Sequence, residues 1–148
     1  MRIEFSVPGD PRGKGRPRFS TYGGRPIAYT DSRTKAYEQL VMKCYMDVPG
    51  EHVFPEDAAV FMFITAYFKI PKATPKLKVR LMKQGVIRPL KAPDWDNIGK
   101  IICDALNGIA YKDDSRVVYG SVEKFYSDNP RVEVILMDSE VFTQWQDG

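Results

Sequence analysis

Four aspartates near the middle of the chain have the residue type and spacing of a metal-binding hydrolytic site. Asp94 and Asp96 flank Trp95 where a helix is expected to begin, and Asp113 and Asp114 follow the end of that helix. Carboxylate oxygens are the ligands that Mg²⁺ prefers, usually one or two of them together with water and a substrate phosphate. A metal held in this way polarises a phosphate ester and lowers the pKa of a water nucleophile. The aspartates therefore predict hydrolysis of phosphate esters, provided that the fold brings the two pairs together.

Lys100 adds a cation to this group, because it lies one helical turn after Asp96 on the same face of the expected helix. Its ammonium is expected to hold a phosphate or to stabilise negative charge in the transition state, an effect worth several kcal/mol for comparable donors. Each feature also has a simpler explanation. An aspartate at a helix start is commonly a cap, two adjacent aspartates often form a turn, and Lys100 with Asp104 makes an ordinary ion pair. The combination, next to a basic segment, favours the catalytic interpretation.

Basic residues gather in two stretches that contain no acidic residue. Five lie within residues 12–30 and eight within residues 69–91, together 13 of the 22 Lys and Arg of the chain. The net charge of +3 is modest, so the segregation of the charge is the informative feature. A polyphosphate partner is the natural explanation. The residues predicted to contact DNA are Arg12, Lys14, Arg16, Arg18, Lys72 and Lys76.

The composition excludes several other classes of protein. One His and two Cys, isolated from each other, cannot form a Cys/His zinc cluster of ordinary spacing, nor a site with a histidine base among further His ligands. The apolar runs are too short to cross a membrane, and the charged N-terminal stretch lacks the apolar core of a secretory signal. A cytoplasmic protein without membrane contact is therefore expected.

The sequence pattern predicts elements that place the aspartates late in the chain. Residues 3–7 alternate as a first strand, residues 9–24 read as a loop or loose hairpin, and a helix capped by Asp31 or Ser32 runs until Pro49 and Gly50. Residues 58–70 suit a central strand buried on both faces. A short basic helix is expected at 75–83 and a periodic helix at 94–106. Strands at 116–126 and 131–137 are separated by a turn, and antiparallel pairing between them is expected.

This order of elements indicates an α+β fold, with a mixed or antiparallel sheet that carries helices on one face. The 148 residues suit a single domain, with a core at about residues 1–137 and a short C-terminal tail that is either an amphipathic helix or extended.

The motifs resemble those of the RusA family of Holliday-junction resolvases. Residues 91–100 (KAPDWDNIGK), 104–107 (DALN) and 113–118 (DDSRVV) are similar to the family pattern (K)PDxDN(L/I)xK…DAL(N)…DDxxV. Residues 7–9 (VPG) and 14–18 (KGRPR) resemble one branch of the family. The resemblance spans about residues 1–137, although residues 19–60 contribute little. Two departures are a residue inserted between Lys91 and Pro93 and the weak helix former Gly99, and neither affects an expected ligand.

The resemblance implies a function, a cofactor and an assembly. It implies that Asp94, Asp96 and Asp114 bind magnesium, for which manganese can substitute, with Asp113 as a reserve ligand and Lys100 as the essential basic partner. It further implies a homodimer that recognises four-way DNA junctions in recombination and repair and nicks two opposed strands symmetrically. A two-fold dimer suits a roughly two-fold substrate, since each subunit then supplies one site.

Three alternatives remain open on the sequence alone. The fold can bind branched DNA without cutting it, with Asp94 and Asp96 serving as caps. It can also be a general nuclease for flaps or single strands, because carboxylates report the chemistry and not the shape of the substrate. A structural protein with a solvated basic face is the third alternative.

Overall fold

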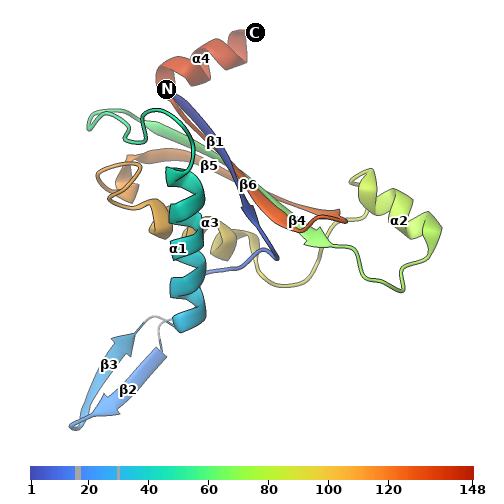
Figure 1. Cartoon of the computed structure of the whole chain (residues 1–148), viewed down its shortest axis with the longest axis horizontal. Helices are drawn as coiled ribbons and strands as arrows, with labels where there is room; N and C mark the ends of the chain where they lie inside the picture. The colour runs from blue at the N-terminus through green and yellow to red at the C-terminus, as the bar shows by residue number, and fades with distance from the viewer. Residues whose placement is uncertain (16–17, 30) are drawn as a thin grey trace.

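The computed structural model describes residues 1–15, 18–29 and 31–148 and contains one main sheet, a separate hairpin and four α-helices (Figure 1). The strands are β1 (Arg2–Pro8), β2 (Arg18–Tyr22), β3 (Arg25–Tyr29), β4 (Val60–Lys69), β5 (Val117–Ser127) and β6 (Arg131–Asp138). The helices are α1 (Ser32–Met46), α2 (Lys76–Lys83), α3 (Trp95–Leu106), the short 3-10 helix η1 (Asp114–Arg116) and α4 (Ser139–Asp147). Among the described helices, none is both long enough and apolar enough to cross a bilayer.

The main sheet is mixed, with the strand order β1-β6-β4-β5. β6 pairs antiparallel with both β1 and β4, whereas β4 and β5 pair in parallel. The prediction that β5 and β6 pair with each other is therefore wrong, because β4 lies between them. The reason is burial: every second residue of β4, from Val60 to Phe68, is buried, whereas β5 contributes half-buried and exposed residues. The strand with the strongest apolar face takes the inner position, and the turn at 128–130 carries the chain across it.

Helices α1 and α3 cover one face of the main sheet and close the core. The ring of Phe5 from β1 meets Tyr45 of α1 edge to face, with 5.5 Å between the ring centroids. Cys103 of α3 contacts the sulfur of Met62 on β4 at 3.7 Å. The residues of α3 that face the sheet are buried, namely Ile98, Ile101, Ile102, Ala105 and Leu106. The helical periodicity predicted for residues 94–106 is thus confirmed. The polar face of α3 points to solvent.

Helix α4 packs on the opposite face of the sheet, so the expectation that the helices share one face is wrong. Phe142 stacks on Phe61 with 4.1 Å between ring centroids, and Trp145 lies 5.7 Å from Phe63. Phe61 and Phe63 alternate with the buried residues of β4, so they form an aromatic surface on the far side. Burial of these aromatic rings is favourable, and the C-terminal tail buries part of their surface by folding as the amphipathic helix α4. β4 is accordingly buried on one face and half-buried on the other.

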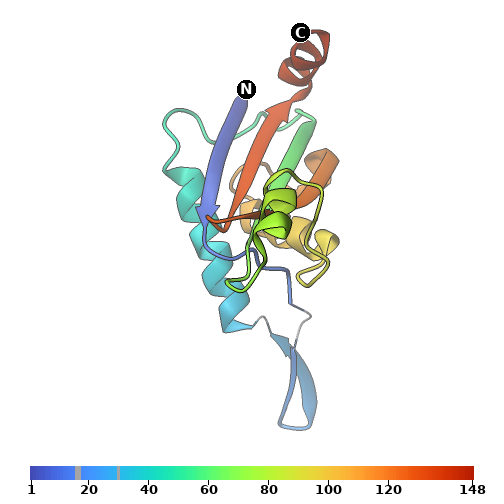
Figure 2. The ribbon, with the colours of Figure 1, turned by 90° about the vertical axis from the view of Figure 1, so that its right-hand side faces the viewer.

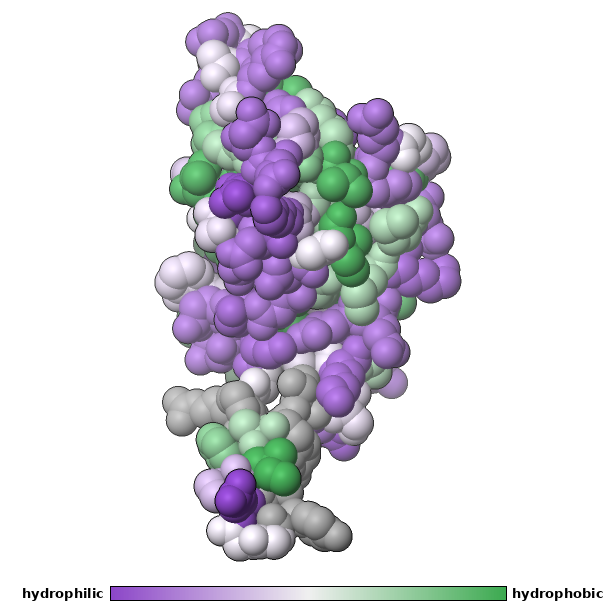
Figure 3. All heavy atoms as spheres, turned by 90° about the vertical axis from the view of Figure 1, so that its left-hand side faces the viewer, coloured by the Kyte–Doolittle hydropathy of each residue, from purple (hydrophilic) through white to green (hydrophobic). Residues whose placement is uncertain are grey.

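The hairpin of β2 and β3 projects from the body and forms no part of the main sheet (Figures 1 and 2). Gly23 and Gly24 join the two strands, with φ of +64° and +77°, the left-handed conformation that a two-residue hairpin turn needs. The predicted loose hairpin is confirmed, although it continues to Tyr29. Seen from the left of Figure 1, the hairpin extends below a mostly hydrophilic body (Figure 3). It carries the exposed apolar residues Phe19 and Ile27.

Two helix boundaries follow the predicted signals. Asp31 caps α1, since its carboxylate accepts a hydrogen bond from the backbone N–H of Arg33 at 3.4 Å. The helix ends at Met46, three residues before Pro49. Helix α2 forms at Lys76–Lys83 as expected, after Pro75, and the chain turns at Gly85.

Candidate active site

The start of α3 presents its two aspartates to solvent. Asp94 occupies the N-cap position, yet its side chain makes no capping hydrogen bond, so a capping role does not account for this carboxylate. Asp96 lies in the first turn of the helix and is exposed. Trp95 between them is 64% exposed, which leaves its indole available at the surface. All three side chains are therefore free of the core.

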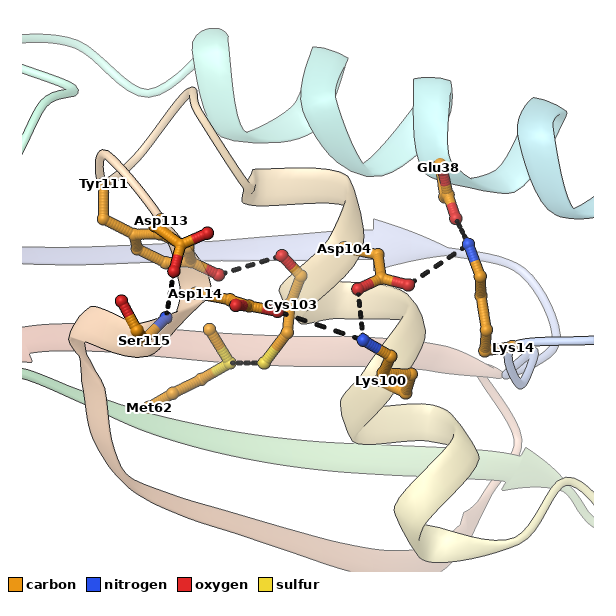
Figure 4. Close-up of polar contacts among 10 residues, drawn as sticks. All are labelled: Lys14, Glu38, Met62, Lys100, Cys103, Asp104, Tyr111, Asp113, Asp114 and Ser115. Carbon is orange, nitrogen blue, oxygen red and sulfur yellow. Dashed lines mark hydrogen bonds and ion pairs between the residues drawn. The ribbon is translucent and has the colours of Figure 1, made fainter. Parts of the chain in front are cut away.

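The two adjacent aspartates after α3 have different environments. Asp113 accepts a hydrogen bond from the backbone N–H of Ser115 at 3.1 Å and so caps η1. Hydrogen bonding to Ser115, first through its side chain and then through its backbone N–H, lowers the pKa of Asp113. Asp114 is the first residue of η1, and one of its carboxylate oxygens lies 3.9 Å from the ammonium of Lys100 (Figure 4). The structure thus brings Asp114 to α3 and gives Asp113 a local role.

Lys100 lies between two carboxylates. Its ammonium donates to Asp104 at 2.8 Å and is paired with Asp114 at 3.9 Å. The hydrogen bond to Asp104 raises the pKa of Lys100, and the charge of Asp114 raises it further. Lys100 is therefore protonated at neutral pH and below, and carries a positive charge beside Asp114. The ordinary helical ion pair between Lys100 and Asp104 that the spacing predicted does form. Lys100 makes this pair and the contact to Asp114 at the same time.

The carboxylates line one side of α3 but do not form a closed metal cage. Asp96, Lys100 and Asp104 follow one another at intervals of four residues, which places them along one face of the helix. Among the described residues, no group of three or more His, Cys, Asp or Glu has the geometry to hold a metal ion. The predicted ligand set of Asp94, Asp96 and Asp114, with Asp113 in reserve, stays a prediction.

The chain after β1 contacts the start of α3. We call its described residues, 9–15, the basic loop. The backbone N–H of Lys14 donates to the carbonyl of Asn97 at 2.9 Å. The ammonium of Lys14 binds Glu38 of α1 at 2.5 Å and Asp104 of α3 at 3.2 Å (Figure 4). Burial alone would lower the pKa of Lys14, but these two hydrogen bonds outweigh it and raise the pKa. Lys14 was predicted to contact DNA, and here its charge is shared between two carboxylates of the protein.

Gly13 is the point where the basic loop passes closest to α3, and it offers a direct test of this docking. A Cβ at this position would lie 2.9 Å from the Cβ of Asn97 and 3.0 Å from that of Pro93. We expect Gly13→Ala to lower the free energy of unfolding by about 1–3 kcal/mol, because the loop or the start of α3 must shift. Urea unfolding measures the change. Gly120→Ala is the matched control, since no atom lies within 4 Å of its added Cβ. An equal effect of both substitutions would contradict the docking.

The other predicted DNA contacts within the described residues lie at four separate places. Lys72 lines a hollow of about 560 Å³ together with Lys69, Lys91 and Pro93, the residue before Asp94. Arg12 lines a hollow of about 370 Å³ between the basic loop and the start of α1. Lys76 is exposed as the first residue of α2. Arg18 begins β2 on the hairpin, and Arg16 lies outside the described residues. Lys72 and Arg12 therefore each line a hollow that Pro93, the residue directly before Asp94, also lines.

Sequence reasoning missed Glu38 altogether and found only one of the two ion pairs of Asp104. Glu38 is the residue of α1 that fixes Lys14, and Asp104 joins Lys14 to Lys100. The spacing of Asp104 from Lys100 signalled one of its two ion pairs. Nothing in the sequence links Lys14 to residues 24 and 90 positions away, because those contacts exist only after the helices have packed.

The fold and this site together define a class of protein. A small α+β domain with exposed aspartates and a lysine along one helix, together with hollows lined by lysine or arginine, is typical of an enzyme that acts on nucleic acid. The chain belongs to the RusA family of endodeoxyribonucleases, since residues 8–137 match the family described as Endodeoxyribonuclease RusA. It is also 37% identical over 138 residues to YqaN of Bacillus subtilis (strain 168), described as an uncharacterized protein, with 92% of this chain and 96% of YqaN covered. The family resemblance of the sequence motifs is thereby confirmed.

Proposed function

We propose that this nuclease is a magnesium-dependent resolvase that acts as a homodimer and opens four-way DNA junctions by paired, symmetric nicks. The observation that carries the proposal is the α3 site, where exposed aspartates flank a protonated lysine within a chain of the endodeoxyribonuclease family. Hydrolysis of a phosphodiester needs a nucleophilic water, a cation at the phosphate and charge stabilisation at the leaving oxygen. The residues of this site match those needs.

Asp94, Asp96 and Asp114 are proposed as the magnesium ligands. In support, the carboxylate of Asp94 is not used for capping, and Asp114 is directed toward α3 by η1. Hard oxygen donors suit magnesium, and manganese accepts the same ligands. When bound, the metal would activate the water nucleophile and polarise the scissile phosphate. Lys100 would hold a non-bridging phosphate oxygen through its ammonium.

The basic surfaces are proposed to hold the DNA arms on either side of this phosphate. The hollow lined by Lys69, Lys72 and Lys91 opens beside Pro93, so its ammonium groups can bind phosphates of the strand that enters the site. The projecting β2–β3 hairpin adds Arg18 and Arg25 on a separate arm. In a two-fold dimer each surface would occur twice, as the symmetry of a four-way junction requires.

A comparison of DNA substrates tests the proposal. Purified protein is incubated with a synthetic four-way junction, linear duplex, a flap and single-stranded DNA, each in magnesium and in EDTA. We expect paired nicks in opposed strands of the junction in magnesium, no nicks in EDTA and little cleavage of the other substrates. Faster cleavage of flaps or single strands would instead favour the general nuclease. Tight junction binding without cleavage in any divalent metal would favour a binding module.

Trp95 is expected to contribute to binding, because an exposed indole beside the site can stack on an unpaired base. Stacking of one base on an aromatic ring contributes about 1–3 kcal/mol. We therefore expect Trp95→Ala to weaken binding to the junction by about tenfold, with a smaller effect on fully paired duplex. Fluorescence anisotropy in calcium measures both. The control is Trp145→Ala, which removes an indole of similar exposure on α4. Equal affinity of the Trp95→Ala variant and the unmodified protein would contradict stacking.

A further inference from the structure

Asp104 is a mostly buried carboxylate that binds a lysine through each of its oxygens. Oδ1 accepts from Lys100 at 2.8 Å and Oδ2 is 3.2 Å from the ammonium of Lys14. Its side chain is 19% exposed, against 56% for Lys100. Its neighbours Ile101 and Ala105 are buried, so the turn of α3 that carries Asp104 is packed against the core. Asp104 is therefore the rigid partner of the pair, and Lys100 is the long side chain that it can hold.

Lys100 has a second acceptor available on its own helix. Asp96 precedes it by four residues, and an acidic residue four positions before a lysine is the more favourable order for a helical ion pair. Long side chains of a helix also point toward its N-terminus, which is toward Asp96. Among the described residues, the ammonium is nonetheless paired with Asp104 and Asp114. Asp104 outcompetes Asp96 for the ammonium.

The second lysine explains how Asp104 is itself held. Lys14 binds it from the basic loop and binds Glu38 on α1 at the same time, so three segments meet at this carboxylate. Two positive charges offset the cost of burying the carboxylate, which would be high for an unpaired one. Asp104 thus has a fixed place and a negative charge, the two properties needed to direct a lysine.

We infer that Asp104 is a positioning residue that keeps Lys100 beside Asp114 and away from Asp96. Two consequences follow for the proposed reaction, on which this inference rests. The ammonium is held on the Asp114 side of the site, where it can meet a phosphate. Asp96 is left without an ion-pair partner among the described residues and is available as a ligand. Without the charge of Asp104, Lys100 would turn to Asp96 and neutralise it.

The experiment compares Asp104→Asn with the unmodified protein, both on DNA and without it. Single-turnover nicking of the synthetic four-way junction in magnesium should slow by about tenfold, with junction affinity unchanged. In a double-mutant cycle, Asp104→Asn should add no further loss to Lys100→Ala, because its effect passes through that lysine. Additive losses would overturn the inference, since they would mean that Asp104 acts independently of Lys100.

A second readout uses the metal-free protein and no DNA. ¹⁵N-lysine NMR spectra at a fixed neutral pH report the surroundings of the Lys100 ammonium. In the Asp104→Asn variant, this ammonium should leave position 104 and pair with Asp96. It should give a changed ammonium shift and new contacts to Asp96 in the Asp104→Asn variant. An unchanged Lys100 signal would overturn the inference whatever the activity. If the unmodified protein cuts no DNA while the Lys100 signal responds as expected, the proposed function fails and the positioning role stands.

Matched variants separate positioning from stability. Asp104→Glu retains the carboxylate and should recover most of the nicking rate, whereas Asp104→Gln should not. If Asp104→Asn fails to fold, the comparison of Asp104→Glu with Asp104→Gln tests the need for a negative charge in its place. Asp47→Asn breaks another lysine–aspartate pair of the same spacing, Lys43 with Asp47 on α1, and should leave nicking unchanged. Equal rates for Asp104→Glu and Asp104→Gln would overturn the requirement for charge.

Discussion

Replacing Asp96 with asparagine is expected to lower the rate of junction nicking in magnesium by about a thousandfold or more, while leaving the protein folded. Asparagine keeps the size of the side chain but removes the negative charge that a magnesium ligand supplies. Asp96 is exposed and lies outside the core, so unfolding should be unaffected. Binding to the junction should stay the same or tighten slightly, because one negative charge near the phosphates is lost. Single-turnover nicking and anisotropy measure the two effects.

The control for this experiment is Asp147→Asn, which removes an exposed carboxylate from α4 at the far end of the chain. It should nick as fast as the unmodified protein. Wild-type nicking by the Asp96→Asn variant would refute the carboxylate mechanism altogether. A variant that no longer binds the junction would instead assign Asp96 to recognition of DNA, and the proposed ligand set would need another member.

The second large effect is expected for Lys100→Ala, which should slow nicking by about a hundredfold. Removing one preorganised donor that stabilises transition-state charge costs about 2.7–4 kcal/mol in comparable enzymes. The loss should appear in kcat and not in KM, because the ammonium acts on charge that develops during the reaction. The concentration of magnesium that gives half the maximal rate should stay unchanged, in contrast to Asp96→Asn. Magnesium titrations of both variants distinguish the two roles.

Lys43→Ala is the matched control, since Lys43 is also a helical lysine paired with an aspartate four residues later. It is exposed on α1 and should not affect nicking. A higher KM with unchanged kcat in the Lys100→Ala variant would show that Lys100 only binds the DNA. The site would then lack its proposed source of charge stabilisation.

Local sequence signals were sufficient for the elements that carry the site. The apolar spacing of Ile98, Ile101 and Leu106 defines the buried face of α3, and the backbone conformation at Asn107 ends the helix. The same signals left Asp94 and Asp96 at its exposed start. The resemblance to the family pattern ranks Asp114 above Asp113 as a ligand, and this ranking stays a prediction. In the structure, Asp113 is the one of the two that caps η1.

Features that depend on how the elements pack together could not be predicted from local sequence patterns. The turn at 128–130 has the composition of a hairpin turn, yet β6 pairs with β1 and β4 and not with β5, because pairing depends on which strand buries the larger apolar face. The position of α4 follows from the aromatic surface of Phe61 and Phe63, whose orientation is decided by the register of β4. The double ion pair of Asp104 joins residues from three segments that no local pattern connects.

The parallel pairing of β4 with β5 has a consequence for how the enzyme can vary. Parallel neighbours need a long crossover connection, and here it contains α2, α3 and η1. Every proposed catalytic side chain therefore belongs to one chain segment whose two ends are fastened to adjacent strands. Insertions or deletions between Lys69 and Pro93 would move the lysines of that segment, whereas the packing of α3 on the sheet would keep Asp94, Asp96 and Lys100 in place. The basic surface can thus change in length and shape while the proposed site on α3 keeps its geometry.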